Sequence, residues 1–267
     1  MKTKRSPDIE KIVRYIRDNV GCGITLDDIA SHVNYSKYHL SREFKKQTGC
    51  SIKQYIEAIR IEKSIEKIMD NQGSVTRVAF DVGHKSPGTF SSTFKKQTKL
   101  SPKKYHSEST QAYKFLTKWI KNNDVLTHNE SSAKTANSLS VRVTYPPEHE
   151  HKITCLGLFR TAIPKGEPVV GVATTDKLEV TLDNVPNGNY YLLACEILED
   201  LTVLKNYNLD KNYRQAILSP LTFNGDSQIH FDITMRKPID SDPPITINIP
   251  AMLMRSFALK SKKNRNS

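Results

Sequence analysis

A fifteen-residue segment of this chain occurs twice, at a spacing of fifty positions. Residues 41–55, SREFKKQTGCSIKQY, return as residues 91–105, SSTFKKQTKLSPKKY, and nine of the fifteen positions are identical. Four apolar positions upstream also recur: Leu26, Ile29, Ala30 and Val33 in the first copy, and Val75, Val78, Ala79 and Val82 in the second. Dense self-similarity at one spacing indicates one structural unit used twice. The chain is therefore predicted to contain two copies of a small helical module.

The charge of the chain is concentrated in its repeat half. Residues 1–121 contain 24 lysines and arginines against 12 acidic residues, whereas residues 122–267 contain 16 of each, so the net charge of +12 falls within the first half. A basic domain of this kind is typical of proteins that bind an anionic partner. Proline is distributed the other way, with three in the first 121 residues and ten in the rest, which favours helices followed by turn-rich β structure. The length of 267 residues allows two domains, with a boundary near residue 122.

Each unit is predicted to fold as a helix, a tight turn and a second helix. Thr25, with Asp28 three residues later, is a capping pattern that begins a short first helix. Asn34 stands where the chain must turn, and the second unit has Gly83 at the equivalent point, where a positive φ has no steric cost. Any pair of short amphipathic helices gives such a pattern. Its occurrence twice within the basic half favours a DNA-binding helix-turn-helix.

The segment between the units is predicted to be one long helix. Ser51 and Gln54 form a capping pattern that opens it, and it ends near residues 70–73. About nineteen residues at 1.5 Å each give a length of roughly 28 Å, close to the roughly 34 Å of one turn of B-DNA. A rod of this length would hold two recognition helices, at about residues 36–48 and 87–98, in successive major grooves on one face of a duplex.

With these elements in place, residues from about 9 to 105 resemble the DNA-binding domain of the AraC/XylS family of transcription regulators. The resemblance is carried by LDDIASHVNYSKYHLSREFKKQTGCSIKQYIEAIRIEKS in the first unit and by VAFDVGHKSPGTFSSTFKKQTKLSPKKYH in the second. It implies a sequence-specific DNA-binding regulator. The most familiar members of the family place the sensor domain before the DNA-binding domain. The order is reversed here, so what is known of how those sensor domains work is not transferred to this chain.

The resemblance also implies which residues of the first unit touch DNA. Positions that contact bases or backbone in similar proteins fall on Ser36, Tyr38, Ser41 and Arg42. Arg42 can bond a guanine edge through two donors or hold a phosphate, Tyr38 can pack on a thymine methyl, and Ser41 can bond a base or the backbone. The alternative for Arg42 is an arginine that is simply solvated on the helix surface.

The second unit departs from the family pattern. The usual aromatic after the turn glycine, the usual Arg or Gln near the helix centre and the usual glycine after the lysine block are His84, Ser92 and Lys99 here. Ser86 followed by Pro87 still favours a helix start, but the side chains at this end lack a donor for a two-bond base contact. We therefore expect the first unit to read sequence and the second to anchor on phosphates and shape. The residues expected to contact DNA are Ser36, Lys37, Tyr38, Ser41, Arg42, Lys45 and Lys46 in the first unit and Ser86, Gly88, Thr89, Ser91, Ser92, Lys95 and Lys96 in the second, with the lysines supplying sequence-independent attraction.

From residue 139 onward apolar residues alternate with a period of two, which indicates β-strands. Seven strands are expected, at residues 139–145, 153–159, 169–174, 178–182, 190–198, 229–235 and 245–253. They predict an antiparallel sandwich, and residues 157–195 resemble prealbumin-like β-sandwich modules. Residues 200–220 break the strand pattern and leave open an irregular connection, a ligand pocket or a dimer contact.

The predicted fold class is α + β with two domains. An all-α double helix-turn-helix domain is expected over residues 1–121, a linker over 122–138 and an all-β antiparallel sandwich for sensing or interaction over 139–259, followed by a basic tail at 260–267.

No constellation for catalysis stands out, so neither enzyme activity nor a cofactor or metal is expected. The residues from Glu148 to His151, EHEH, have metal-binding chemistry, but two histidines two positions apart without a second pair favour an exposed polar turn. The polar N-terminus, the short apolar runs and four cysteines without a C-x-x-C pair predict a cytoplasmic protein without a membrane span.

Two functions are open at this point. The first is a transcription regulator, activator or repressor, whose candidate partners are double-stranded DNA, RNA polymerase and, through the β domain, a small-molecule effector or a second copy. The alternative is a ligand-binding β module that the basic helical domain tethers to nucleic acid without sequence choice. The ratio of affinities for a specific and a random duplex, followed over salt, distinguishes the two.

Overall fold

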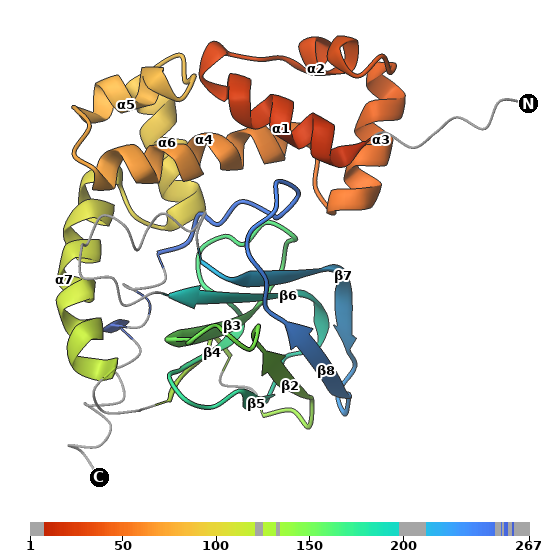
Figure 1. Cartoon of the computed structure of the whole chain (residues 1–267), viewed down its shortest axis with the longest axis vertical. Coiled ribbons are helices and arrows are strands. Elements are labelled where there is room, and N and C mark those ends of the chain that lie inside the picture. Colours follow the sequence, from red (N-terminus) through yellow and green to blue (C-terminus); the bar gives the residue numbers. More distant parts are fainter. Residues whose placement is uncertain are drawn as a thin grey trace, which may run out of the picture.

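The computed structural model describes residues 8–120, 125–131, 134–197 and 212–248, together with residues 252, 254, 255 and 258. Within these residues a helical region precedes a β region, and α7 extends from the first alongside the strands of the second (Figure 1). The helical elements are α1 (Ile9–Asn19), the 3-10 helix η1 (Val20–Cys22), α2 (Leu26–His32), α3 (Lys37–Thr48), α4 (Ile52–Met69), α5 (Val75–Asp81), α6 (Pro87–Thr98) and α7 (Pro102–Ile120). None of the described helices is both long and apolar enough to cross a membrane.

The caps expected from the sequence begin these helices. Thr25 accepts a hydrogen bond from the Asp28 backbone N–H, and the Asp28 side chain accepts from the Thr25 N–H in return, which completes a capping box at α2. Ser51 and Gln54 form the same arrangement at α4. Such caps satisfy backbone donors that the first turn of a helix leaves unbonded, so they fix where the helices start.

The turn between the two helices of each unit requires a left-handed residue. Asn34 has φ 56° and Gly83 has φ 84° at equivalent points. A Cβ at Gly83 would lie 2.5 Å from the Val20 carbonyl oxygen, so this turn has room only for glycine. The predicted helix-turn-helix plan is therefore confirmed in both units.

Each unit has its own hydrophobic core, and the two cores repeat one aromatic contact. Phe44 meets Tyr55 edge to face with ring centroids 5.4 Å apart, and fifty positions later Phe94 meets Tyr105 in the same way at 5.4 Å. All four side chains are buried. The identical residues of the repeat are thus partly core residues, which explains why both copies keep them.

The β region consists of two sheets that pack face to face. One has the strand order β1-β4-β3-β6-β7, and the other has the order β5-β2-β8. The strands are β1 (Leu126–Asn129), β2 (Ser138–Thr144), β3 (Ile153–Phe159), β4 (Val170–Thr174), β5 (Glu179–Asp183), β6 (Gly188–Ile197), β7 (Arg214–Phe223) and β8 (Gln228–Thr234). Apolar side chains from both sheets share one core. The pairing is antiparallel throughout except between β2 and β8, which are parallel, so the three-stranded sheet is mixed and not purely antiparallel as predicted.

Two strands lie where none was predicted. β1 falls within the segment 122–138, predicted to be a linker, because Leu126 is buried and anchors it beside β4. β7 occupies part of the irregular segment 200–220. It is an edge strand, where Pro220 is tolerated, and its pairing with β6 shifts register between Tyr190 and Leu192. Residues 200–211 of that segment and the basic tail 260–267 lie outside the described residues.

One predicted strand, at residues 245–253, is wrong in its described part. Residues 245–248 pair with no strand. Ile245 and Ile247 both pack on the outer face of the five-stranded sheet, which explains the alternation in the sequence. The backbone N–H of Ile245 donates instead to the Glu62 side chain, and the Ile247 carbonyl accepts from the Tyr105 hydroxyl. Side chains of the helical region thus supply hydrogen-bond partners for the backbone of this segment.

Candidate nucleic-acid interface

Tyr38 and Arg42 lie one turn apart on α3 and both face solvent. Tyr38 is 78% exposed, more than any other large apolar residue that the structure describes. The Arg42 side chain is 59% exposed. Residues at this spacing share one face of a helix, so an apolar ring and a guanidinium stand side by side there. This pair has the chemistry that reads a thymine methyl and a guanine edge.

The other predicted residues of the first unit are also at the surface, and some have structural partners. Ser36 caps α3 by accepting from the His39 backbone N–H at 3.3 Å, which leaves its hydroxyl proton for another acceptor. Lys37 forms an exposed ion pair with Asp27. Lys45 and Lys46 are exposed in the last turn of α3, whereas Ser41 is half-buried.

The equivalent end of α6 carries only short side chains. Ser86 caps the helix by accepting from the Thr89 backbone N–H at 3.2 Å and donates to the Thr89 hydroxyl at 3.0 Å. A Cβ at Gly88 would meet nothing within 4 Å, so the helix surface is open there. Ser92 is exposed at the position that Arg42 holds in α3, Ser91 is half-buried, and Lys95 and Lys96 are exposed.

A groove of about 520 Å³ lies between the two units. It is lined from α3, α4 and α6 by Ser41, Lys53, Glu57, Arg60, Thr89 and Thr93, among others. The two recognition helices therefore flank one hollow, and α4 forms its floor.

Arg60 and His84 line this groove and were missed by sequence reasoning. Burial lowers the pKa of His84, the charge of Arg60 lowers it further, and Glu57 opposes both, so the imidazole is neutral at neutral pH. Its ring meets Phe90 edge to face at 5.3 Å, so His84 fills the place of the aromatic expected after the turn glycine. Lys53, Glu57 and Arg60 recur at helical spacing on α4, and this is the signal that could have identified Arg60.

The EHEH segment is not a simple exposed turn. The Nε2 atom of His149 lies within hydrogen-bond distance of both carboxylate oxygens of the buried Glu196, at 3.0 Å from Oε1 and 2.9 Å from Oε2. Its ring also stacks on Tyr213, with centroids 4.0 Å apart. Within the described residues, no group of three or more His, Cys, Asp or Glu side chains is arranged to hold a metal ion.

Comparisons with known proteins give relatives for the helical region. A family model described as a helix-turn-helix domain matches residues 29–108. The multiple antibiotic resistance protein MarA of Escherichia coli is 32% identical over 103 residues, which cover 39% of this chain and 81% of MarA. The lactose operon transcription activator of Staphylococcus xylosus is 34% identical over 98 residues, which cover 37% of this chain but only 35% of that activator.

Two solved structures are also similar to part of this chain. The C-terminal domain of AraT, a response regulator from Geobacillus stearothermophilus, has 29% identity and a TM-score of 0.37, and the match covers 39% of this chain and 88% of that one. The DNA-binding domain of AdpA in complex with a target DNA has 21% identity and a TM-score of 0.38, with 40% and 96% covered.

Proposed function

This chain belongs to the AraC/XylS family of DNA-binding transcription regulators, through its helix-turn-helix region at residues 29–108, and on that premise we propose how it reads DNA. Its two recognition helices, α3 and α6, would enter successive major grooves of one duplex. α4 has 18 residues, or about 27 Å at 1.5 Å each, and is the element that would set their separation.

The observation that carries this proposal is the position of both recognition helices beside one groove. Their exposed N-terminal halves flank a hollow to which each contributes side chains. If α3 and α6 lie in neighbouring major grooves, the intervening phosphates pass over α4. Arg60 and Lys53 would then meet the backbone there, as a supplement to the lysines at the ends of α3 and α6.

The division of labour between the units is the finer part of the proposal. Tyr38 and Arg42 supply an apolar and a two-donor contact from α3, whereas Gly88 and Ser92 at the equivalent places of α6 supply neither. The first unit would therefore read bases, and the second would hold phosphates and respond to DNA shape.

Titration of the full chain against a specific and a random duplex over a range of salt concentrations tests the proposal. Both affinities should fall with salt, because lysine contacts release counterions, while their ratio stays well above one. A ratio near one at every salt concentration would favour the alternative, a β module tethered to nucleic acid without sequence choice. The short side chains of α6 support this alternative, because they offer no two-bond contact to a base.

Further partners belong to the proposal as well. RNA polymerase is the partner expected of an activator, and the β region is where an effector or a second copy would bind. This chain matches 81% of the length of MarA but only 35% of the lactose operon activator, so the partners of those proteins are not transferred to it.

A further inference from the structure

A loop of the β region that follows β3, residues 160–167, contacts both repeat units within a few residues; we name it the loop segment. Ile163 is only 2% exposed and belongs to the hydrophobic core of the first unit. Three residues later the Gly166 backbone N–H donates to the Gln97 carbonyl at 3.0 Å, in the last turn of α6. The loop segment therefore connects the core of one unit to the recognition helix of the other.

A second part of the β region, residues 240–248, crosses the helical region in the same direction; we name it the terminal segment. Its hydrogen bonds in chain order join Asp242 O to Tyr55 Oη at 3.2 Å, Ile245 N to Glu62 Oε1 at 3.0 Å, and Asn248 Nδ2 to Ser109 Oγ at 2.8 Å. Tyr55 and Glu62 both lie in α4, Tyr55 at the end that packs into the core of the first unit, and Ser109 lies in α7. Glu62 is buried and also accepts from Arg17 at 2.9 Å, so Arg17 compensates its charge and each carboxylate oxygen has a hydrogen-bond donor.

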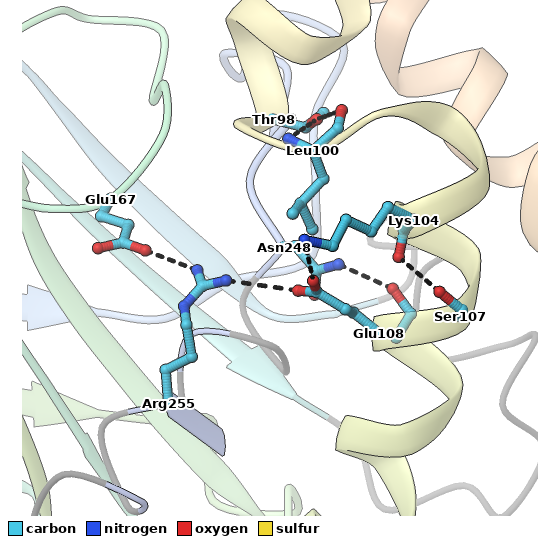
Figure 2. Close-up of polar contacts among 9 residues, drawn as sticks. Thr98, Leu100, Lys104, Ser107, Glu108, Glu167, Asn248 and Arg255 are labelled. Carbon is cyan, nitrogen blue, oxygen red and sulfur yellow. Dashed lines mark hydrogen bonds and ion pairs between the residues drawn. The ribbon is translucent and has the colours of Figure 1, made fainter.

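The two segments are also joined to each other and to α7. The Thr246 hydroxyl donates to the Pro164 carbonyl at 3.1 Å. Arg255 reaches Glu167 at 2.6 Å and Glu108 of α7 at 3.5 Å, and Figure 2 shows its guanidinium between these two carboxylates. The contact between the regions is therefore continuous from the first unit to α7.

The loop segment meets the two recognition helices at equivalent positions of the repeat. Gly49 and Lys99 end α3 and α6, fifty positions apart, and both are left-handed. A Cβ at Gly49 would lie 2.8 Å from the Ala162 Cβ, and a Cβ at Gly166 would lie 2.6 Å from the Lys99 side chain. The loop segment thus meets the C-terminal end of each recognition helix with almost no space between them.

We infer that the β region is a brace that fixes the separation and angle of the two recognition helices. It holds both helices at their C-terminal ends, whereas Tyr38 and Arg42 lie roughly 16 and 10 Å along α3 from Gly49. The base contacts proposed for Tyr38 and Arg42 and the contacts of the brace therefore use opposite ends of the same helix. The inference rests on the proposed function, since a fixed separation matters only when both helices contact one duplex.

If the β region is such a brace, it determines, together with α4, which separation of the two half-sites the protein prefers. The test measures affinities of the full chain for duplexes whose two half-sites are separated by distances that differ by one base pair. Gly49→Ala places a methyl group against Ala162, and Ala162→Gly in the same chain removes the atom that it meets. Gly23→Ala is the matched control, because Gly23 has the same φ of 72° and nothing within 4 Å of its would-be Cβ.

The preference of Gly49→Ala for the best separation over its neighbours should fall by about threefold, because contacting residues couple at this level. The double variant should restore the preference, and Gly23→Ala should leave it unchanged. Lys99→Gly gives an independent variant that folds readily, since glycine suits its φ of 66°, and it should broaden the profile by releasing the second unit.

A wild-type spacing profile in both Gly49→Ala and Lys99→Gly would overturn the brace and assign spacing to α4 alone. Equal broadening by Gly23→Ala would overturn it too, because backbone strain would then be the cause. A wild-type chain that binds specific and random duplexes alike would overturn the proposed function itself, and the brace with it.

Discussion

The guanidinium of Arg42 donates from Nε and Nη2 to one carboxylate oxygen of Glu43, at 3.1 and 3.0 Å. An exposed ion pair of this kind contributes little, so a base edge or phosphate can replace Glu43 as the acceptor. If Arg42 reads a base, Arg42→Ala should cost about 1–3 kcal/mol at the preferred site and little on random DNA. Fluorescence anisotropy titrations on both duplexes measure this.

Ser92→Ala at the equivalent position of α6 is the matched control for Arg42→Ala. It should bind both duplexes nearly as the wild type does, because Ser92 lacks the reach for a two-bond base contact. Equal losses on the two duplexes for Arg42→Ala would reassign Arg42 to the phosphate backbone.

Tyr38→Ala should weaken specific binding without changing stability, because the ring is 78% exposed and contributes little to the core. If the ring packs on a thymine methyl, replacement of thymine by uracil at the contacted position should weaken the wild type and leave Tyr38→Ala unaffected. The same effect of uracil on the wild type and on Tyr38→Ala would show that Tyr38 does not contact the thymine methyl. Thermal unfolding of the variant checks that the fold is intact.

Lysine substitutions should act on salt dependence and not on sequence preference. Lys45→Gln or Lys95→Gln should each reduce the slope of log affinity against log salt by about 0.9 for one lost phosphate contact, on specific and random duplexes alike. Lys134→Gln, an exposed lysine of the β region, is the control that should leave the slope unchanged. A changed specificity ratio in the first two variants would show that these lysines contact bases.

The pKa of His84 should give the helical region a pH-dependent stability. Because burial and Arg60 lower this pKa in the folded state, the unfolded chain binds the proton more readily. The free energy of unfolding should therefore fall as pH drops through about 6.5 and level off below the folded pKa. His84→Phe, which keeps an aromatic ring against Phe90, should remove this contribution.

Urea unfolding of the wild type and His84→Phe at about pH 7.5 and about pH 5 makes the comparison. The variant should lose less stability than the wild type over this interval. An identical loss in both proteins would show that His84 does not titrate across it.

The helical half was predictable because its determinants are local. The capping boxes at Thr25 and Ser51 and the positive φ of Gly83 all follow from residues within a few positions of one another. Because the two units repeat, the helices predicted for one unit could be checked against the sequence of the other. Arg60 was within reach of the same reasoning, since its place on α4 follows from helical spacing.

The parts that sequence reasoning missed depend on distant partners. Ile245 and Ile247 alternate as in a strand, yet the Ile245 backbone bonds Glu62, 183 positions away in sequence. Val125 and Leu126 are two apolar residues in a polar stretch, and only pairing with the edge of β4 makes Leu126 part of a strand. No local pattern distinguishes such segments from a true strand or a linker.

A base-by-base binding profile of the full chain tests whether the first unit reads bases while the second holds phosphates. We expect bases contacted by α3 to carry most of the information, with weak preferences beneath α6, and Arg42→Ala to flatten the profile only in the first half-site. Equal information in both half-sites, or a flat profile in the wild type, would contradict this expectation.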